Sequence, residues 1–362
     1  MAKLLNCFGA QDVYLSGNPE MTLFGKDYAR LTHFVSKNEN FFKKSQKFGS
    51  ILEVEIPNKS LVDLKTDNEC GGDLLNGLTL FLDLPPNNVY KKDVDCGIID
   101  YAEIYVDETC IQKITGDYIK ITNKLLYPHD NTVFSNNQIV IDLPFWFKDI
   151  GNSFPMICLK NKKVWLKIKF RDLKNVTKKI NHFDNTFECN IAAKYVYLDM
   201  EEKRSFLRKD NISLIKTIHY HDLKSDQHIE INAENHLVDF YFFYSKEDNE
   251  ILEYKSLAKN VELSIDTNQI ASFPKMYYTF YQQSAYTNSI DDVYVYSFSL
   301  DPAKHIQPTG FNKNNCKLTF KLDVENNHEE YTFKFISRNY SILVVKNNEF
   351  ELDTIQSQCA KI

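Results

Sequence analysis

The stretch Val164-Trp165-Leu166-Lys167-Ile168-Lys169-Phe170 shows the pattern that runs through most of the chain. In an extended strand, the apolar residues at positions 164, 166, 168 and 170 lie on one face and the two lysines on the other. Leu78-Thr79-Leu80-Phe81-Leu82-Asp83-Leu84 places its four leucines on one face in the same way. Because apolar residues recur with a period of two, both stretches predict strands with one buried face.

The same alternation predicts strands along the rest of the chain. They are Leu52–Ile56, Ile98–Val106, Gln138–Leu143, Ala193–Leu198, Leu237–Tyr244, Val261–Ile265, Val293–Leu300, Lys317–Leu322, Tyr331–Ile336 and Ser341–Val345. Segments rich in Pro, Asn and Asp separate the strands, and they predict turns. So many short strands at this spacing are typical of all-β sandwiches, not of alternating strands and helices.

One charged segment breaks the alternation. Asp199–Arg208 contains neither Gly nor Pro, and Asp199 can cap the N-terminus of a helix whose first turn is acidic. The sequence therefore predicts a short helix that divides the chain. We expect an N-terminal arm (1–19), a first sandwich (20–198), a linking helix (199–214), and a second sandwich with a C-terminal tail (215–362). Each half is long enough for eight strands and its own core.

Composition favours strands and argues against nucleic-acid binding. The chain has 26 Phe and 21 Tyr among 362 residues, and aromatic side chains suit a pleated, half-buried surface. A net charge of −6 predicts no general affinity for phosphate backbones. The basic residues are nearly all Lys, which lacks the planar guanidinium that binds phosphate bidentately. The five arginines are Arg30, Arg171, Arg204, Arg208 and Arg338.

The eight cysteines predict free thiols. They are scattered along the chain at positions 7, 70, 96, 110, 158, 189, 316 and 359, with no CxxC pair. Without zinc-type spacing, they are typical of a protein in a reducing compartment. The first residues lack an apolar core of a signal peptide, and no 18-residue apolar run occurs. We therefore expect neither secretion by a signal peptide nor a membrane-spanning helix.

Few residues suggest chemistry. His219-Tyr220-His221 places two imidazoles on one side of an extended segment, a geometry that could bind a metal, but no third ligand lies nearby in sequence. His129 falls in a predicted turn, and the acidic pairs Asp93/Asp95 and Asp291/Asp292 are interpreted as solvated loop charges rather than a calcium site. GxSxG, HExxH and P-loop motifs are absent. We predict no catalytic residue, cofactor or metal.

Four ordered strings resemble one family, the double jelly-roll major capsid proteins of nucleocytoplasmic large DNA viruses. The first is the opening Gly9–Phe24, and the second is Leu143-Pro144-Phe145-Trp146-Phe147 followed by Phe154–Leu159. The third, Tyr195–Asp199 with the charged residues that follow, is similar to the family's junction between its two halves. The fourth is Val293–Pro302 followed by Gln307-Pro308-Thr309-Gly310. These strings occur in the family's order and cover most of the chain.

The resemblance implies a structural role without enzymatic activity. It implies two consecutive eight-stranded jelly rolls joined by a short helix, with three copies forming a pseudo-hexagonal capsomer of an icosahedral shell. Implied partners are the chain itself, neighbouring capsomers, minor capsid proteins and an inner viral membrane, with no direct contact to nucleic acid. The implied location is the virion, with assembly in the host cytoplasm. Phe145-Trp146-Phe147 is expected in a strand with aromatic side chains on both faces.

Three alternatives stay open from the sequence. The chain could be a capsid paralogue, or a trimeric scaffold of the same fold that shapes the viral membrane. From another class, it could be a cytoplasmic β-sandwich that binds carbohydrate through exposed Tyr and Trp. Four Asn-X-Ser/Thr sequons, at Asn58, Asn175, Asn211 and Asn339, are potential glycosylation sites.

Overall fold

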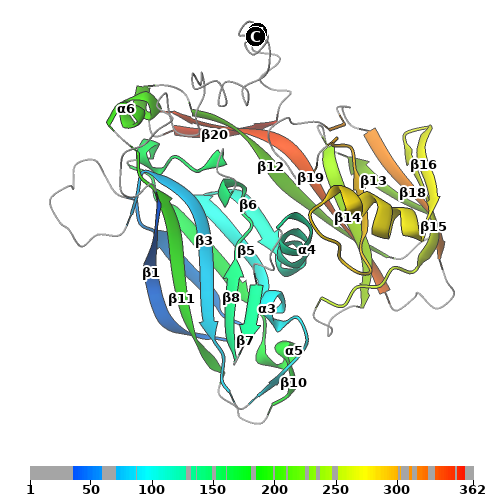
Figure 1. The fold of residues 1–362 in the computed structure, drawn as a ribbon, viewed down its shortest axis with the longest axis horizontal. Helices are drawn as coiled ribbons and strands as arrows, with labels where there is room; N and C mark the ends of the chain where they lie inside the picture. The colour runs from blue at the N-terminus through cyan, green and yellow to red at the C-terminus, as the bar shows by residue number, and fades with distance from the viewer. Residues whose placement is uncertain are drawn as a thin grey trace, which may run out of the picture.

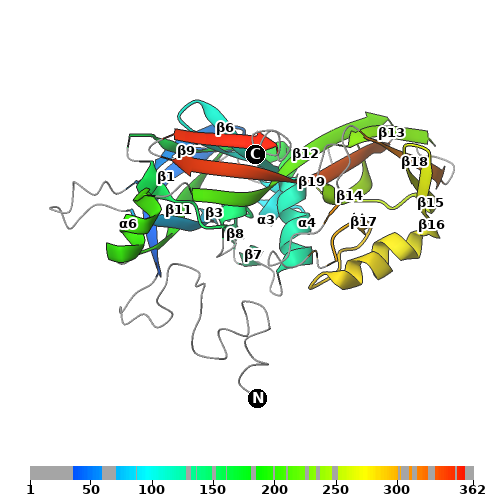
Figure 2. The same ribbon diagram turned by 90° about the horizontal axis from the view of Figure 1, so that it is seen from above.

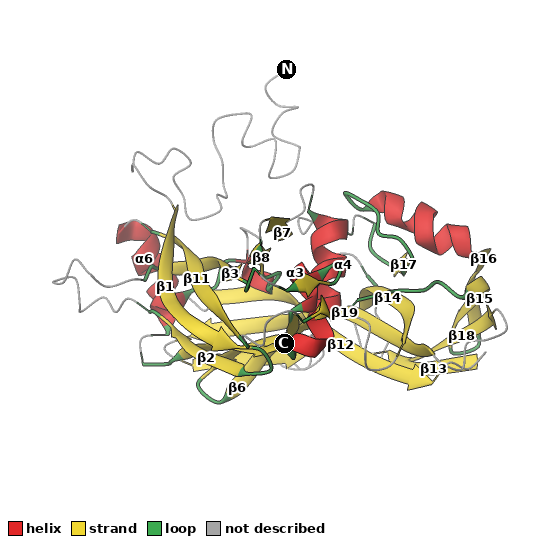
Figure 3. Ribbon diagram, turned by 90° about the horizontal axis from the view of Figure 1, so that it is seen from below, coloured by secondary structure: helices red, strands yellow, loops and turns green. Residues whose placement is uncertain are grey.

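A computed structural model gives the fold of most of the chain. It describes residues 36–58, 71–86, 88–127, 132–135, 137–148, 152–159, 161–180, 185–198, 200–208, 211–224, 228–233, 237–246, 252–300, 302, 310–311, 316–324, 331–346 and 349–354. The predicted arm at 1–19 lies outside these residues. Two β-sandwiches lie side by side, with few helices between and beside them (Figures 1 and 3).

The first sandwich consists of two facing antiparallel sheets. One has the strand order β1-β11-β3-β8-β7 and the other β2-β9-β5-β6. Their bounds are β1 (Ser36–Lys47), β2 (Ile51–Ile56), β3 (Leu74–Asp83), β5 (Ile99–Val106), β6 (Thr109–Thr115), β7 (Thr132–Ser135), β8 (Gln138–Asp142), β9 (Val164–Phe170) and β11 (Thr186–Val196). A separate short ribbon pairs β4 (Val89–Tyr90) with β10 (Thr177–Lys179).

The second sandwich repeats this arrangement. Its sheets are β12-β19-β14-β17, with β20 added beside β19, and β13-β18-β15-β16. Their bounds are β12 (Asn211–Lys224), β13 (His228–Ala233), β14 (Leu237–Lys246), β15 (Ala258–Ile265), β16 (Asn268–Pro274), β17 (Tyr294–Ser297), β18 (Cys316–Val324), β19 (Tyr331–Lys346) and β20 (Glu349–Thr354).

Strand order identifies each half as a jelly roll. In the first half we number β1, β2, β3, β5, β6, β8, β9 and β11 from one to eight. The sheets then read 1-8-3-6 and 2-7-4-5. The eight strands β12 to β19 give the same two orders in the second half. Two sheets interleaved in this way form the double Greek key of a jelly roll. The predicted fold class is therefore confirmed.

Alternation builds the cores as the sequence predicts. Along β9 the side chains alternate between buried and half-buried, with Val164 and Phe170 both inward. Leu78, Leu80 and Leu82 of β3 are buried as well. The first core is mainly aliphatic, whereas the second is filled with Phe and Tyr. Each roll therefore has a buried interior of its own.

Short helices occupy the connections. Their bounds are α3 (Val94–Gly97), α4 (Gly116–Leu126), η1 (Trp146–Lys148), η3 (Met156–Cys158), α5 (Leu173–Val176), α6 (Met200–Arg208), η4 (Tyr277–Tyr281) and η5 (Gln282–Ala285). Helix α6 lies at the predicted junction, but β12 already begins at Asn211, inside the stretch 199–214 assigned to the linker. No helix among the described residues is long and apolar enough to cross a membrane.

The predicted strand at Phe145-Trp146-Phe147 is wrong. Strand β8 ends at Asp142, and the aromatics instead lie at a 3₁₀ turn, η1. Pro144 has no N–H to donate to a strand ladder, so the pairing cannot continue through it. All three aromatics are buried, and the Trp146 ring meets Phe154 edge-on at 5.4 Å.

Gly116, the first residue of α4, permits a close approach. A Cβ there would lie 2.4 Å from the Ile99 carbonyl oxygen, a backbone atom that cannot swing away. Alanine usually stabilises a helix relative to glycine. Here we expect Gly116→Ala to lower the free energy of unfolding by about 1–3 kcal/mol, the usual cost of overpacking. Urea unfolding at one protein concentration measures the change.

Gly77→Ala is the matched control for Gly116→Ala. A Cβ at Gly77 would lie 3.6 Å from Lys194 Cβ, an ordinary contact. This variant should show no comparable loss of stability. Equal stability of the wild type and Gly116→Ala would contradict the close approach.

Candidate functional site

The two jelly rolls meet at one broad contact. Strand β6 and helix α4 of the first roll lie against β12, β14 and β19 of the second (Figure 1). The Gln112 side-chain amide donates to the Lys216 carbonyl at 2.9 Å. The Lys120 ammonium donates to the Leu252 carbonyl at 2.8 Å and lies 4.6 Å from the centre of the Tyr254 ring. Contacts from several elements therefore hold the rolls in one orientation.

A buried ion pair lies at the centre of this contact. Arg338 of β19 and Asp239 of β14 are 1% and 0% exposed. Arg338 Nε donates to Asp239 Oδ1 at 2.6 Å, and Nη2 donates to Oδ2. The Tyr286 hydroxyl also donates to Oδ2, at 2.8 Å. The carboxylate is therefore well supplied with donors.

Charge and burial act in opposite directions on these groups. Burial by itself raises the pKa of Asp239, but the adjacent Arg338 charge and its hydrogen bonds lower this pKa below its usual range. Burial likewise lowers the pKa of Arg338, and the Asp239 carboxylate raises it well above the usual value. Both groups are therefore charged at neutral pH.

The cavity that the described residues leave beside the ion pair is small. A cavity of about 30 Å³ lies beside Arg338, between Tyr118, Trp146 and Lys216. This volume is close to that of one water molecule. The buried polar cluster is consequently a structural joint between the rolls.

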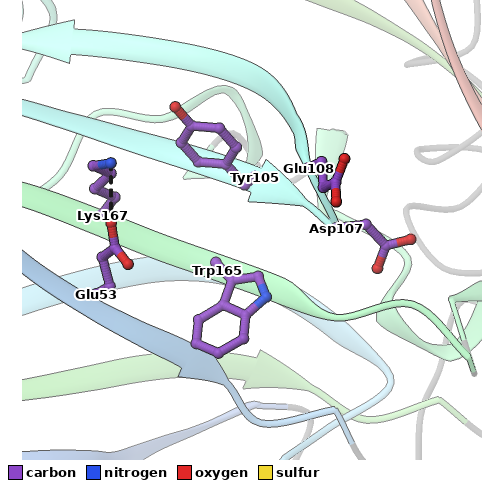
Figure 4. A pocket seen from close by; sticks show the side chains of 6 residues that line it. All are labelled: Glu53, Tyr105, Asp107, Glu108, Trp165 and Lys167. Carbon is purple, nitrogen blue, oxygen red and sulfur yellow. Dashed lines mark ion pairs between the residues drawn. The ribbon is translucent and has the colours of Figure 1, made fainter.

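A shallow hollow lies on the outer face of the sheet β2-β9-β5-β6. Figure 4 shows Trp165 and Tyr105 on neighbouring strands, with acidic side chains around them. Its volume is about 290 Å³, and its lining includes Glu53, Asp107, Glu108 and Lys167. Burial, then the Glu103 carboxylate, raises the pKa of Tyr105 to about 12. Its mixture of aromatic and polar side chains suits a small polar ligand or a neighbouring protein surface.

Ion pairs recur on the same outer face in both rolls. In the first roll Lys167 lies 2.9 Å from Glu53, and a second pair joins Lys163 to Glu55 at 3.1 Å. In the second roll the corresponding sheet β13-β18-β15-β16 pairs Lys317 with Glu230 at 3.1 Å and Lys321 with Glu262 at 3.3 Å. Exposed pairs contribute only about 0–1 kcal/mol each to stability. They give these outer faces a polar, charged character.

An apolar surface of a different kind lies on the second roll. What we call the aromatic ridge consists of Phe273 near the end of β16, Met276 just before η4, and Phe280 and Tyr281 of η4. Tyr277 stacks between two of them, with ring centres 4.1 Å from Phe273 and 5.4 Å from Tyr281. Two of the four ridge side chains therefore pack on Tyr277, and all four are exposed to solvent.

The described histidines and acidic residues that the sequence singled out contact residues of their own roll. His219 and His221 lie on one side of β12, and the His221 ring packs 5.9 Å from Phe335. Asp93 pairs with Lys120 at 3.0 Å, while Asp292 bonds to the Ser256 hydroxyl. No group of three or more His, Cys, Asp or Glu among the described residues could hold a metal. His129 lies outside the described residues.

The sequons differ in accessibility. Asn339 is 2% exposed, and Asn211 Nδ2 donates to the Phe206 carbonyl at 2.8 Å and to a second backbone carbonyl. Asn339 therefore has no room for a glycan in the folded chain, whereas Asn211 is half-buried and its amide is hydrogen-bonded. Asn58 and Asn175 are half-buried, and Asn58 Nδ2 donates to the Leu159 carbonyl at 2.8 Å.

Three of the four strings noted in the sequence lie, wholly or in part, among the described residues. Leu143–Phe147 and Phe154–Leu159 pack at one end of the first core. Tyr195 leads into the junction, and its hydroxyl donates to the Pro57 carbonyl at 2.8 Å. Val293–Ser297 covers β17 and the residue before it, and there Val293 and Val295 pack toward the first roll and Tyr294 toward the second core. The strings therefore mark internal packing, and the opening Gly9–Phe24 lies outside the described residues.

Comparison with known proteins identifies the class. Residues 22–199 match a family model described as "Major capsid protein N-terminus". The major capsid protein of Pyramimonas orientalis virus is 22% identical, over 94% of this chain and 96% of that protein. Capsid protein 1 of Acanthamoeba polyphaga mimivirus is 26% identical over 60% of this chain, which spans 43% of that relative.

Solved structures agree on the fold. A quasi-atomic model of the PBCV-1 virus capsid superposes with a TM-score of 0.73 at 16% identity, over 91% of this chain and 99% of that one. The Faustovirus major capsid protein gives a TM-score of 0.63 at 7% identity, over 94% of each chain. The chain is therefore a double jelly-roll viral structural protein. It belongs to the major capsid protein family of large DNA viruses, a family of capsid components and not of enzymes.

Proposed function

We propose that three copies of this chain form a pseudo-hexagonal capsomer that tiles an icosahedral shell. The observation that carries this proposal is the repeated strand order: one chain holds two jelly rolls of the same topology side by side. Three such chains around a threefold axis supply six similar lobes, and closed rotational symmetry is the usual form of protein assembly. In this proposal residues 20–198 and 215–362 are the two lobes, and 1–19 is an arm that reaches a neighbour.

The surfaces support different contacts within and between capsomers. The exposed ridge suits a strong contact between subunits, since apolar and aromatic side chains dominate interface cores. The charged outer sheets suit weaker contacts between capsomers, which allow misplaced tiles to detach. Minor capsid proteins and an inner membrane are the further partners in this proposal, with assembly in the host cytoplasm. No cofactor or catalytic residue takes part.

Mass in solution tests the proposal. We expect the purified chain to sediment as a trimer, three times 42.3 kDa. Electron microscopy then distinguishes a tile from a scaffold: trimers on the outer facets of virions indicate a tile, whereas a honeycomb on a spherical membrane indicates a scaffold. A chain that stays monomeric at high concentration contradicts both.

The hollow at Trp165 and Tyr105 supports a second candidate function, carbohydrate binding. A β-sandwich with an exposed aromatic platform could bind carbohydrate. A monomer that binds glycans, and loses that binding in Trp165→Ala, would support this function in place of the capsomer.

A further inference from the structure

The aromatic ridge is uncovered in the single chain. Met276 is 69% exposed, and Phe280 and Tyr281 are each 65% exposed. Single exposed apolar side chains are common, but a contiguous group of large ones marks a contact surface. The ridge lies on the connection between β16 and β17, the fifth and sixth strands of the second roll.

In the first roll, the connection at the same position is buried against the second roll. Its connection between the fifth and sixth strands of the roll carries helix α4. Helix α4 is buried nearly all round because it lies between α3, β5 and β6 of its own roll and the second roll, where Tyr118 lies beside Arg338 of β19 and Lys120 donates to the Leu252 carbonyl. The backbone N–H groups of Thr287 and Asn288 donate to the Leu125 carbonyl at its C-terminal end. A helix in this connection therefore docks on the neighbouring roll's 1-8-3-6 sheet.

The outer face of the 1-8-3-6 sheet, on which such a helix docks, differs in exposure between the two rolls. In the second roll the outer side chains of β14, Tyr241 and Phe243, are 0% exposed because the first roll covers them. In the first roll the outer face of the equivalent strand β3 carries Phe81, which is 39% exposed. Phe81 lies between Asn190 of β11 and Val140 of β8, which are both half-buried. We call this surface the Phe81 face.

Within one chain, the contact between a helix and a 1-8-3-6 sheet is made once, by α4 on the second roll. The aromatic ridge and the Phe81 face are a helix and a sheet of the same kind that stay exposed. Figure 2 shows α4 between the two rolls and the η4–η5 helix along the free side of the second roll. The strands β11, β3 and β8, which carry the Phe81 face, belong to the first roll (Figure 2). The exposed helix and the exposed sheet therefore belong to different rolls.

We infer that the aromatic ridge of one copy docks on the Phe81 face of a second copy. This inference rests on the proposed trimer and names its contact surfaces. The internal contact between α4 and the β14 sheet is the template: the same pairing of helix and sheet repeats between chains. Head-to-tail contacts then alternate with internal ones around the ring, and after three chains no ridge remains open. The ridge forms the centre of a larger contact, since stable interfaces bury about 800 Å² on each partner.

Two charge variants test the two surfaces separately. The ridge variant carries Met276→Glu and Phe280→Glu, and the face variant carries Phe81→Glu, with Phe81→Thr as a milder form. Each should weaken every ridge-to-face contact by about 30-fold or more, the effect of losing one hot spot worth about 2 kcal/mol, and the proposed trimer holds three such contacts. Ile51→Glu is the matched control, because Ile51 is a 49% exposed apolar residue on the other sheet of the first roll. It should remain trimeric.

Mixing the variants gives the sharpest outcome. The ridge variant keeps an intact Phe81 face, and the face variant keeps an intact ridge. An equimolar mixture should therefore form a two-chain complex by analytical ultracentrifugation, although each variant alone is monomeric. Trimeric ridge and face variants would overturn the inference and leave the capsomer standing. A monomeric wild type would overturn both.

Discussion

Arg338→Met is expected to lower the free energy of unfolding by about 3–5 kcal/mol, the cost of removing one partner from a buried ion pair. Asp239 would then be left as an uncompensated charge at 0% exposure. The Tyr286 hydroxyl could still donate to it, but a neutral donor does not replace the guanidinium. Chemical denaturation at a fixed protein concentration measures the loss.

A double variant separates the charge from the packing. Arg338→Met combined with Asp239→Leu removes both charges, and it should recover most of the stability, because apolar replacement of a whole buried pair is often neutral. If the double variant is as unstable as Arg338→Met, then packing around Arg338, and not the unpaired carboxylate, explains the loss.

The same pair makes the wild type sensitive to acid. The pKa of Asp239 in the folded chain lies below its ordinary value, so the unfolded chain binds a proton at this site more readily. The pair's contribution is therefore present above the ordinary Asp pKa of about 4, and it is lost as pH falls through the lower folded value. The double variant should lose less stability than the wild type over that acidic range.

Phe242→Ala is the second substitution with a large expected effect, a loss of about 3–5 kcal/mol. Phe242 is 0% exposed in the second core, where its ring lies parallel to Tyr294 with centres 4.5 Å apart. Phe320 and Phe333 contact it at 5.2 and 5.5 Å. Truncation leaves a cavity among rigid rings that cannot close around it, and the offset aromatic contacts are lost as well.

Ile51→Ala is the control for Phe242→Ala. Its side chain faces solvent on β2, so its loss should change stability by less than about 0.5 kcal/mol. Thermal unfolding of both variants at equal concentration is the measurement. A Phe242→Ala variant as stable as the wild type would show that the second core repacks.

Alternation predicted several strands with one buried face, such as β3 and β9, but it missed others of the same kind, such as β13. Strand β14, which is buried on both faces, was also predicted, but helix α4 was not. Helix α4 was missed because Tyr118, Ile119, Lys120 and Ile121 are all buried between the two rolls, which removes the amphipathic stripe of a surface helix. Its one local signal was Thr115, whose hydroxyl accepts from Tyr118 N at 3.3 Å as an N-cap.

Polar residues where the two rolls meet also caused the longest described strand, β19, to be predicted as two shorter strands. The sequence predicted two strands, Tyr331–Ile336 and Ser341–Val345, because Ser337-Arg338-Asn339 interrupts the apolar pattern. The structure has one strand, β19, through all of them. These three polar residues are buried where the rolls meet, and Arg338 finds its partner 99 residues away. A pairing so distant in sequence is set by the tertiary fold and has no local pattern.

The pair β12 and β19 serves as a rigid beam between the two lobes. Its register runs from Asn211–Val345 to Lys224–Thr332 without a bulge. One end packs on the first core through Ile215 and the other on the second through Leu223. Repeated head-to-tail contacts close into a ring only when the turn at each step is constant, and otherwise they grow into an open helical filament. In the proposed capsomer, the stiff pair holds the part of that turn that lies inside each chain constant, which favours a closed ring over a filament.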